Sequence, residues 1–147
     1  MARRIKMAQI GQWARECKRA QRSIFQSSAQ KLGNDVTKTV NEGGLLPIKT
    51  GNLRSSFKSS TASMVQLDRS NVEYSQEDWQ LGILGADVGD TLYLGFRAVY
   101  AARQNYGFVG QDSLGRTFNQ SGKYFVEGSA ARWQQFVKEA EREHAVK

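Results

Sequence analysis

Apolar residues in the first third of the chain recur in steps of three and four. They are, in order, Ile10, Trp13, Cys17, Ala20, Ile24, Leu32, Val36 and Val40. At about 100° per residue this spacing places them on one stripe of a helix. The pattern predicts one long amphipathic helix from Met7 to about Asn41, and a kink in it would fall at Gly33. Gly43 and Gly44 follow as its expected C-terminal stop.

Basic residues occupy the other side of the same predicted helix. They follow the order i, i+3, i+4, i+7 and are Arg15, Lys18, Arg19 and Arg22. The helix is thereby sorted into a packing side and a cationic side. We expect the cationic side to face DNA or an acidic partner, and a plain solvated face is the alternative.

The middle of the chain is typical of short strands. Residues 57–67 are rich in hydroxyl and branched side chains, as in a partly exposed strand. Two further strands are predicted at 79–85 (WQLGILG) and 91–96 (TLYLGF). The segment 86–90 (ADVGD) between them has the Gly and Asp of a tight turn, so an antiparallel hairpin is expected.

The last third contains two predicted helices separated by a glycine-rich segment. Residues 98–107 are expected to form a short helix that stops at Gly107. Residues 107–123 have four glycines and little periodicity, which predicts a long flexible loop or a hairpin. The final helix is amphipathic. Its apolar face holds Trp133, Phe136, Val137 and Ala140, and its polar face holds Lys138, Glu139, Glu141 and Arg142.

These elements predict one α+β domain over residues 1–147: an antiparallel sheet packed against a long N-terminal helix and a C-terminal helix. A hydrophobic fraction of 39% is sufficient for a core, and no linker divides the chain. Residues 1–8 form a basic arm with no apolar segment typical of a secretory signal. No apolar run approaches the roughly 18 residues of a membrane span, so no membrane contact is expected.

The net charge of +7 is concentrated at one end of the chain. Residues 1–25 hold seven basic groups and one acidic group, whereas residues 26–147 are nearly balanced. This asymmetry indicates a phosphate-rich or acidic partner for the N-terminal region, with a solubilising tail as the alternative.

Few residues offer catalytic chemistry. His144 is the only histidine and lies near the end of the chain, so no His-based triad or His-rich metal site is expected. Cys17 is the only cysteine and lies on the apolar stripe, where an inert buried thiol is expected. The acidic residues around the predicted strands would suit a Mg²⁺ site, although Asp is also common in turns. They are Glu73, Glu77, Asp78, Asp87 and Asp90. We expect no catalytic residues, no metal and no cofactor.

The stretch LPIKTGNLRSSF (46–57) interrupts the chain between the predicted helix and strands. Pro47 cannot continue the helix, and Thr50 is a suitable N-cap for a single turn over residues 52–55. That turn would direct Leu53 into the core and present Arg54 outward, and a merely solvated Arg54 is the alternative.

Two motifs resemble those of the head–tail junction proteins of tailed bacteriophages, the tail-completion or neck family of the lambda-like tail-component type. The first, P-hydrophobic-x-T-G-x-L-R-x-S, is matched by Pro47, Thr50, Gly51, Leu53, Arg54 and Ser56. The second, Y-A-x-x-x-x-x-G, is matched by Tyr100, Ala101 and Gly107. The resemblance covers roughly residues 8–142. One departure is Asn105, where the family usually has an acidic residue.

The resemblance implies a virion structural protein, assembled in the host cytoplasm, that forms a ring at the head–tail junction around the DNA channel. Its implied partners are further copies of itself in a ring of sixfold symmetry, the adjacent head-completion or connector and tail-tube proteins, and passing double-stranded DNA. The matched residues would then be ring-interface candidates. A small basic nucleic-acid-binding protein and, less favoured, a Mg²⁺-dependent nuclease are the alternatives.

Overall fold

The computed structural model describes residues 7–48, 51–69, 73–111 and 113–145 and confirms the α+β class. The elements, in chain order, are α1 (Met7–Val36), the 3-10 turn η1 (Val40–Glu42), α2 (Asn52–Ser55), β1 (Phe57–Ser60), α3 (Trp79–Leu84), β2 (Tyr93–Phe96), α4 (Ala101–Tyr106), β3 (Gly107–Gln111), β4 (Thr117–Ser121), α5 (Phe125–Ala130) and α6 (Trp133–His144). The described strands form two separate two-stranded antiparallel sheets in place of the single sheet that we predicted.

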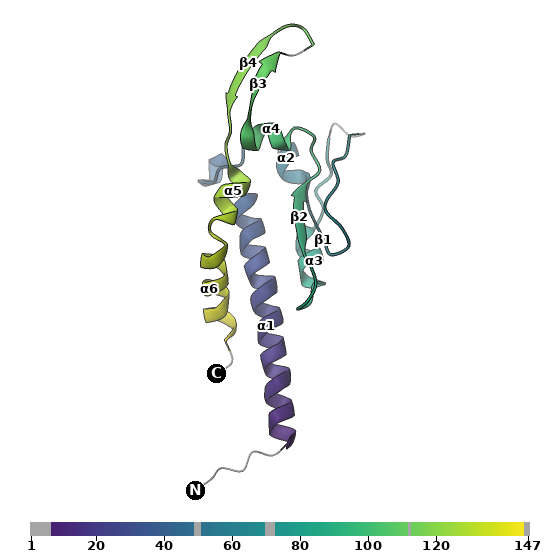
Figure 1. Cartoon of the computed structure of the whole chain (residues 1–147), viewed down its shortest axis with the longest axis vertical. Coiled ribbons are helices and arrows are strands. Elements are labelled where there is room, and N and C mark those ends of the chain that lie inside the picture. Colours follow the sequence, from purple (N-terminus) through teal and green to yellow (C-terminus); the bar gives the residue numbers. More distant parts are fainter. Residues whose placement is uncertain (1–6, 49–50, 70–72, 112, 146–147) are drawn as a thin grey trace.

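Helix α1 runs along the long axis of the molecule (Figure 1). Helices α5 and α6 pack along one side of its C-terminal half, and α3 with the β1–β2 sheet lies on the other. The β3–β4 hairpin extends from the end opposite to the N-terminus of α1. Among the described residues, no helix is long and apolar enough to cross a bilayer.

Helix α1 ends at Val36 and not near Asn41, because the chain turns back to bury Leu46, which is 0% exposed. The backbone N–H of Leu46 donates to the Lys38 carbonyl at 3.2 Å, and Leu46 in turn accepts from the N–H of Val40 at 3.0 Å. The stop predicted at Gly43 belongs to η1, which this glycine caps in the left-handed region at φ 88°.

Gly33 lies inside the helix, and its role is close packing. A Cβ built on Gly33 would lie 3.0 Å or less from three ring carbons of Trp79 in α3. A hydrogen in place of a side chain therefore lets the two helices approach each other.

The segment 79–85 is helix α3, so the predicted hairpin across 86–90 is wrong. Strand β2 pairs instead with β1, in a register that sets Phe57 opposite Phe96. A short apolar run fits a buried strand and a buried helix equally well. Here Asp78 favours the helix, because its side chain accepts from the N–H of Gln80 at 3.2 Å and caps the first turn.

The C-terminal elements follow the sequence pattern more closely. Helix α4 ends at Gly107, which has φ 89°, as predicted. The glycine-rich segment forms a regular hairpin, in which Gly107 pairs with Ser121. In α6 the predicted apolar face is confirmed, since Phe136 and Ala140 are buried.

The core lies where α1, α2, β1, α4 and α5 meet. Its buried members are Val36, Leu46, Leu53, Phe57, Tyr74, Ala98, Ala101 and Phe125. Phe96 joins two of the rings, with its centroid 5.0 Å from that of Phe57 and 5.4 Å from that of Phe125. This cluster contains no residue from the first 29 positions of α1, so the core supports only one end of that helix.

Candidate functional site

The N-terminal part of α1, residues 7–24, is named the free half of α1, and its first turns project beyond the rest of the domain (Figure 1). Every buried residue of α1 lies at or beyond Ser28. The side chains of Met7, Ile10 and Trp13 are 82%, 45% and 61% exposed. The apolar stripe is therefore a packing face over only part of its length, and Cys17 on it is half-buried and not a core thiol.

Polar contacts with α6 and with the residues just before it hold the C-terminal half of α1. Lys31 Nζ donates to Glu143 Oε1 at 2.8 Å, and Ser27 Oγ donates to Glu143 Oε2 at 3.4 Å. The hydrogen bond from Lys31 is the main reason that the pKa of the Glu143 carboxyl lies below its ordinary value. Further along, Asp35 accepts from Ser129 Oγ at 2.7 Å and pairs with Arg132. None of these contacts lies closer to the N-terminus than Ser27, so none of them holds the free half.

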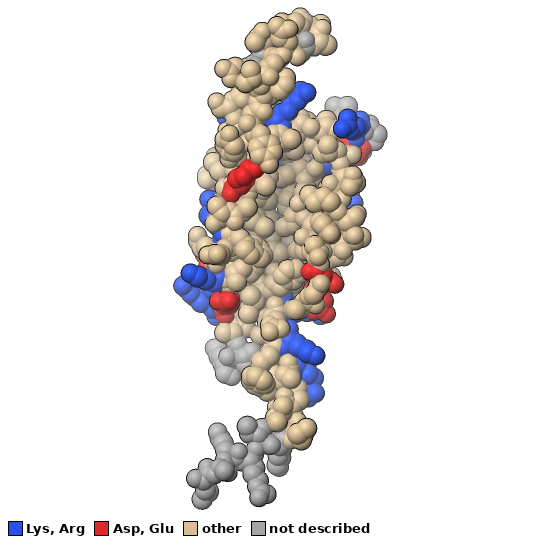
Figure 2. Space-filling view, viewed as in Figure 1, with Lys and Arg blue, Asp and Glu red and all other residues tan. Residues whose placement is uncertain are grey.

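The basic stripe of Arg15, Lys18, Arg19 and Arg22 is exposed, as predicted. Within the described ranges, none of these four side chains has an ion-pair or hydrogen-bond partner. Figure 2 shows basic side chains along the lower part of α1, below a group of acidic ones. Self-repulsion among close cations is thus uncompensated by direct contacts.

The upper end of the basic stripe borders the 86–90 turn. The sequence pattern did not indicate that the two lie side by side. Gln26 Nε2 donates to the carbonyls of Leu84 and Ala86, at 3.1 and 2.8 Å, and so holds this turn against α1. Asp87 and Val88 then line a pocket of about 430 Å³ together with the stripe. Its other lining residues are Lys18, Arg19, Gln21 and Arg22.

Residues of the two phage-like motifs come together in space. Asn52 Nδ2 donates to the Tyr100 hydroxyl at 3.0 Å, which links α2 to the start of α4. Pro47, Gly51 and Leu53 line a pocket of about 270 Å³ with Tyr100. Since the motifs are far apart in sequence, this contact gives them a shared structural role.

Several motif residues are parts of the core and not of the surface. Leu53 and Ala101 are buried, the former as predicted. Ser56 is 0% exposed, and its Oγ donates to the Leu53 carbonyl at 2.7 Å. Gly51, at φ 79°, occupies the N-cap position of α2, and the predicted capping residue Thr50 lies outside the described residues.

Arg54 is exposed, as predicted, but it is not free. Its Nη1 lies 2.8 Å from Glu42 Oε1, which ties α2 to the η1 turn. Both side chains are nearly half exposed, so the pair stabilises the fold little and would be available to a neighbour.

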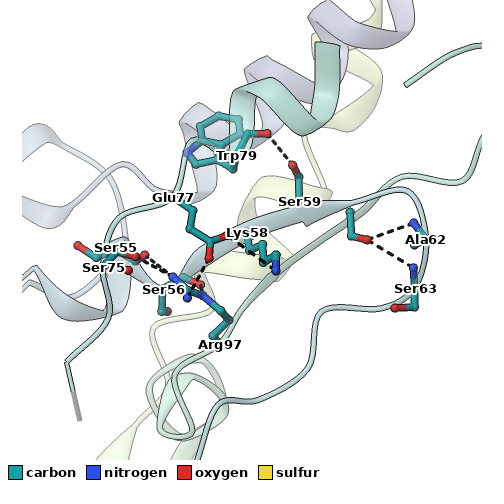
Figure 3. A network of polar contacts seen from close by, with 11 residues as sticks. Ser55, Ser56, Lys58, Ser59, Ala62, Ser63, Ser75, Glu77, Trp79 and Arg97 are labelled. Atoms are coloured by element: carbon teal, nitrogen blue, oxygen red, sulfur yellow. Dashed lines mark hydrogen bonds and ion pairs between the residues drawn. The ribbon is translucent and has the colours of Figure 1, made fainter. Parts of the chain in front are cut away.

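Arg97 is the centre of a network of polar contacts that the sequence did not indicate (Figure 3). Its guanidinium is only 13% exposed and donates to the carbonyls of Ser75 at 2.8 Å and Ser55 at 3.2 Å. It also reaches Glu77 Oε1 at 3.3 Å and lies over the Tyr74 ring at 5.6 Å. These contacts fasten the loop before α3 to the β1–β2 sheet. The signal would have been a basic residue directly after a strand, which is too general to identify it.

Asn105 joins the base of the β3–β4 hairpin to α5. This side chain is 3% exposed, its Oδ1 accepts from the N–H of Val126 at 3.0 Å, and its Nδ2 donates to Glu127 Oε2 at 2.7 Å. Partial burial opposes ionisation of Glu127, but the hydrogen bonds from Asn105 and Tyr106 outweigh it and lower its pKa. The hydrogen bond between Tyr106 and Glu127 and the negative charge of Glu127 raise the pKa of Tyr106. Asn105 is thus an amide that pairs with a carboxylate.

The acidic residues considered for Mg²⁺ have other roles. Asp90 Oδ2 accepts from the N–H of Asp87 at 2.8 Å, which is the turn role that Asp commonly has. Glu77 pairs with Arg97, and Asp78 caps α3. In the part of the chain that the structure describes, no three His, Cys, Asp or Glu residues gather as metal ligands.

No protein-family model, no curated protein and no solved structure matches this chain. The functional assignment therefore depends on the sequence motifs and on the surfaces described above.

Proposed function

We propose that this chain is a structural subunit of a tailed-bacteriophage virion that forms a ring at the head–tail junction, as a tail-completion, tail-terminator or neck protein. The proposal begins from the two motifs around Thr50 and Tyr100. It places the protein in the virion after assembly in the host cytoplasm, beside head-completion or connector and tail-tube proteins.

The observation that carries the proposal is the presence of two projections at opposite ends of one small domain. The free half of α1 exposes Trp13 at one end. The β3–β4 hairpin exposes Val109 by 76% and Leu114 by 75% at the other. Large exposed apolar side chains grouped in this way mark interaction surfaces. Two different surfaces on one subunit suit heterologous contacts, which close into rings.

The basic stripe fits the same role. Lys and Arg side chains that lack an internal counter-ion suit phosphates of any sequence, as required along a channel through which a genome passes. Reversing two charges, Arg15→Glu with Arg19→Glu, should leave the thermal transition unchanged because both side chains are exposed. Particle assembly or DNA retention should fall, and raised salt should act in the same direction. Wild-type yields of infectious particles from this variant would make the stripe a solvated face.

The experiment that tests the function is removal of the gene from the phage that carries it. Heads should fill normally, while tails fail to join or end at the wrong length. Joined, infectious particles without the protein would contradict the proposal.

A stand-alone nucleic-acid-binding protein is the second candidate, and it is favoured by the same four unpaired cations. It predicts that the isolated protein binds duplex DNA tightly and that the binding constant falls steeply as salt is raised. For each phosphate that the protein neutralises, a tenfold rise in salt should lower the logarithm of the binding constant by about 0.9. Weak binding at low salt would remove this candidate and leave the ring proposal in place.

A further inference from the structure

The apolar residues on the free half of α1 follow the spacing of a coiled coil. They alternate in steps of three and four and are named the α1 seam: Ile10, Trp13, Cys17, Ala20 and Ile24. These are a and d positions of a heptad pattern, which line the contact between two helices. At least Ile10 and Trp13 are open to solvent. The free half thus presents a helix-pairing face without a helix on it.

Most charged residues of this region lie away from the seam. Four of the five positions that flank it, at the e and g sites, are uncharged, and the exception is Glu16. The basic residues lie at the b, c and f sites, on the far side of the helix. A second helix laid on the seam would therefore meet almost no charge. Two copies of α1 paired in this way would direct their basic stripes away from each other.

Helix α6 covers the upper continuation of the seam, and its position determines the direction in which a second helix on the seam must run. The seam continues upward into Ser27 and Lys31, which hold Glu143 near the end of α6. With 12 residues against the 30 of α1, α6 covers only the upper part of this face. A parallel second copy would bring its own α6 against the first one. In an antiparallel pair the two domains lie at opposite ends, and the two seams cover each other along their full length.

We infer that the free half of α1 pairs antiparallel with the free half of α1 of a second copy, as a two-fold dimer in solution. A second copy is the favoured occupant because it supplies an apolar stripe of the same length, with the same uncharged flanks and no opposed cations. The contact is small, so a dissociation constant of about 10 μM is expected. This inference does not rest on the proposed function and competes with it for one surface: the proposed ring uses the free half of α1 in a heterologous contact, whereas the pair makes an isologous one.

The test is the mass of the full chain by sedimentation velocity at about 100 μM and after dilution. The wild-type protein should be a dimer that dissociates on dilution. Trp13→Glu should be monomeric, with association weakened at least about tenfold, because a buried carboxylate replaces a large apolar contact within the pair. Its melting temperature should not change, since Trp13 makes no contact with the core. The matched control is Gln12→Glu, which adds the same charge at an outer position one residue away and should still dimerise.

Cys17 provides a second, independent measurement because it lies at the middle of the seam. A short bismaleimide should join two wild-type chains through this thiol, and neither Trp13→Glu nor the chemical control Cys17→Ser should be joined. A wild-type monomer at the highest concentration would mean that another protein covers the seam, and the inference would be wrong. A dimer that survives Trp13→Glu, or a larger closed ring as the only assembly, would overturn it equally.

Discussion

Replacing Gly33 by alanine tests the close contact between α1 and α3. The new Cβ would lie 3.0 Å or less from three ring carbons of Trp79, whereas carbon atoms normally approach to roughly 3.5–4.0 Å. The ring cannot move freely, because its edge contacts Phe57 at a centroid distance of 5.2 Å. The carbonyl of Trp79 is also held, by Ser59 Oγ at 2.6 Å.

Two opposing terms set the magnitude. Alanine in place of glycine inside a helix stabilises the protein by about 1 kcal/mol. Overpacking of a filled contact costs about 1–3 kcal/mol. The expected net effect of Gly33→Ala is a loss of between about 0 and 2 kcal/mol. Gly11→Ala is the matched control in the same helix, where the nearest atom is Arg15 Nη1 at an ordinary 3.5 Å. That variant should be stabilised by up to about 1 kcal/mol, so the difference between the two isolates the overpacking term.

Urea denaturation of both variants, followed by tryptophan fluorescence, gives the two free energies of unfolding. A third variant, Gly33→Ala with Trp79→Leu, should recover part of the loss relative to the sum of the single changes, because the smaller side chain makes room for the methyl group. Equal stabilisation by Gly33→Ala and Gly11→Ala would refute the close approach of α1 and α3.

Four further predictions concern the polar contacts and the hairpin. Arg97→Met should cost about 1–3 kcal/mol in urea denaturation, because the carbonyls of Ser55 and Ser75 lose a charged donor; a cost below 1 kcal/mol would mean that water replaces the guanidinium. Asn105→Asp should cost about 1–3 kcal/mol at pH 7 by setting a second carboxylate beside Glu127, and its melting temperature should recover as acidification protonates the pair; a loss that is the same at pH 5 and pH 7 would exclude charge repulsion. The pKa of Glu143 is lowered in the folded state, so its pairing with Lys31 stabilises above the ordinary glutamate pKa and is lost as pH falls below roughly 4; melting curves of Lys31→Met should lack this component. Deletion of residues 107–123 should leave the thermal transition nearly unchanged, because none of the segment's described residues belongs to the core, and should impair assembly; an unfolded variant would make the hairpin part of the core.

The sequence predicted those parts of the fold whose cause is local. The periodicity of α1 and the two faces of α6 follow from residues within each helix, and Gly107 stops α4 because of its own backbone freedom. The pairing of β1 with β2 joins segments more than thirty residues apart, and no local pattern specifies it. For the same reason α3 was predicted as a strand: its six residues have no clear period, and burial of Ile83 fits either structure.

The candidate surfaces were predicted in part. Exposure of the basic stripe follows from helical geometry, and so does exposure of Arg54 on a single turn. The pairing of Arg54 with Glu42 depends on how the chain turns back after α1, and the Arg97 contacts depend on a loop that crosses the sheet. The apolar stripe was expected to pack along its whole length. How much of it is covered depends on where α6 ends, which is a tertiary property.

The unequal lengths of α1 and α6 have a consequence for the energetics of association. An isolated peptide spanning residues 7–24 would have to nucleate its own helix, at a cost of about 4 kcal/mol. In the whole protein the packed half of α1 already provides that nucleus, and the remaining turns only have to propagate from it. Any partner of the free half therefore meets a preformed helix and does not have to order a coil. A synthetic copy of this segment would consequently be a poor competitor, although it carries every residue of the contact.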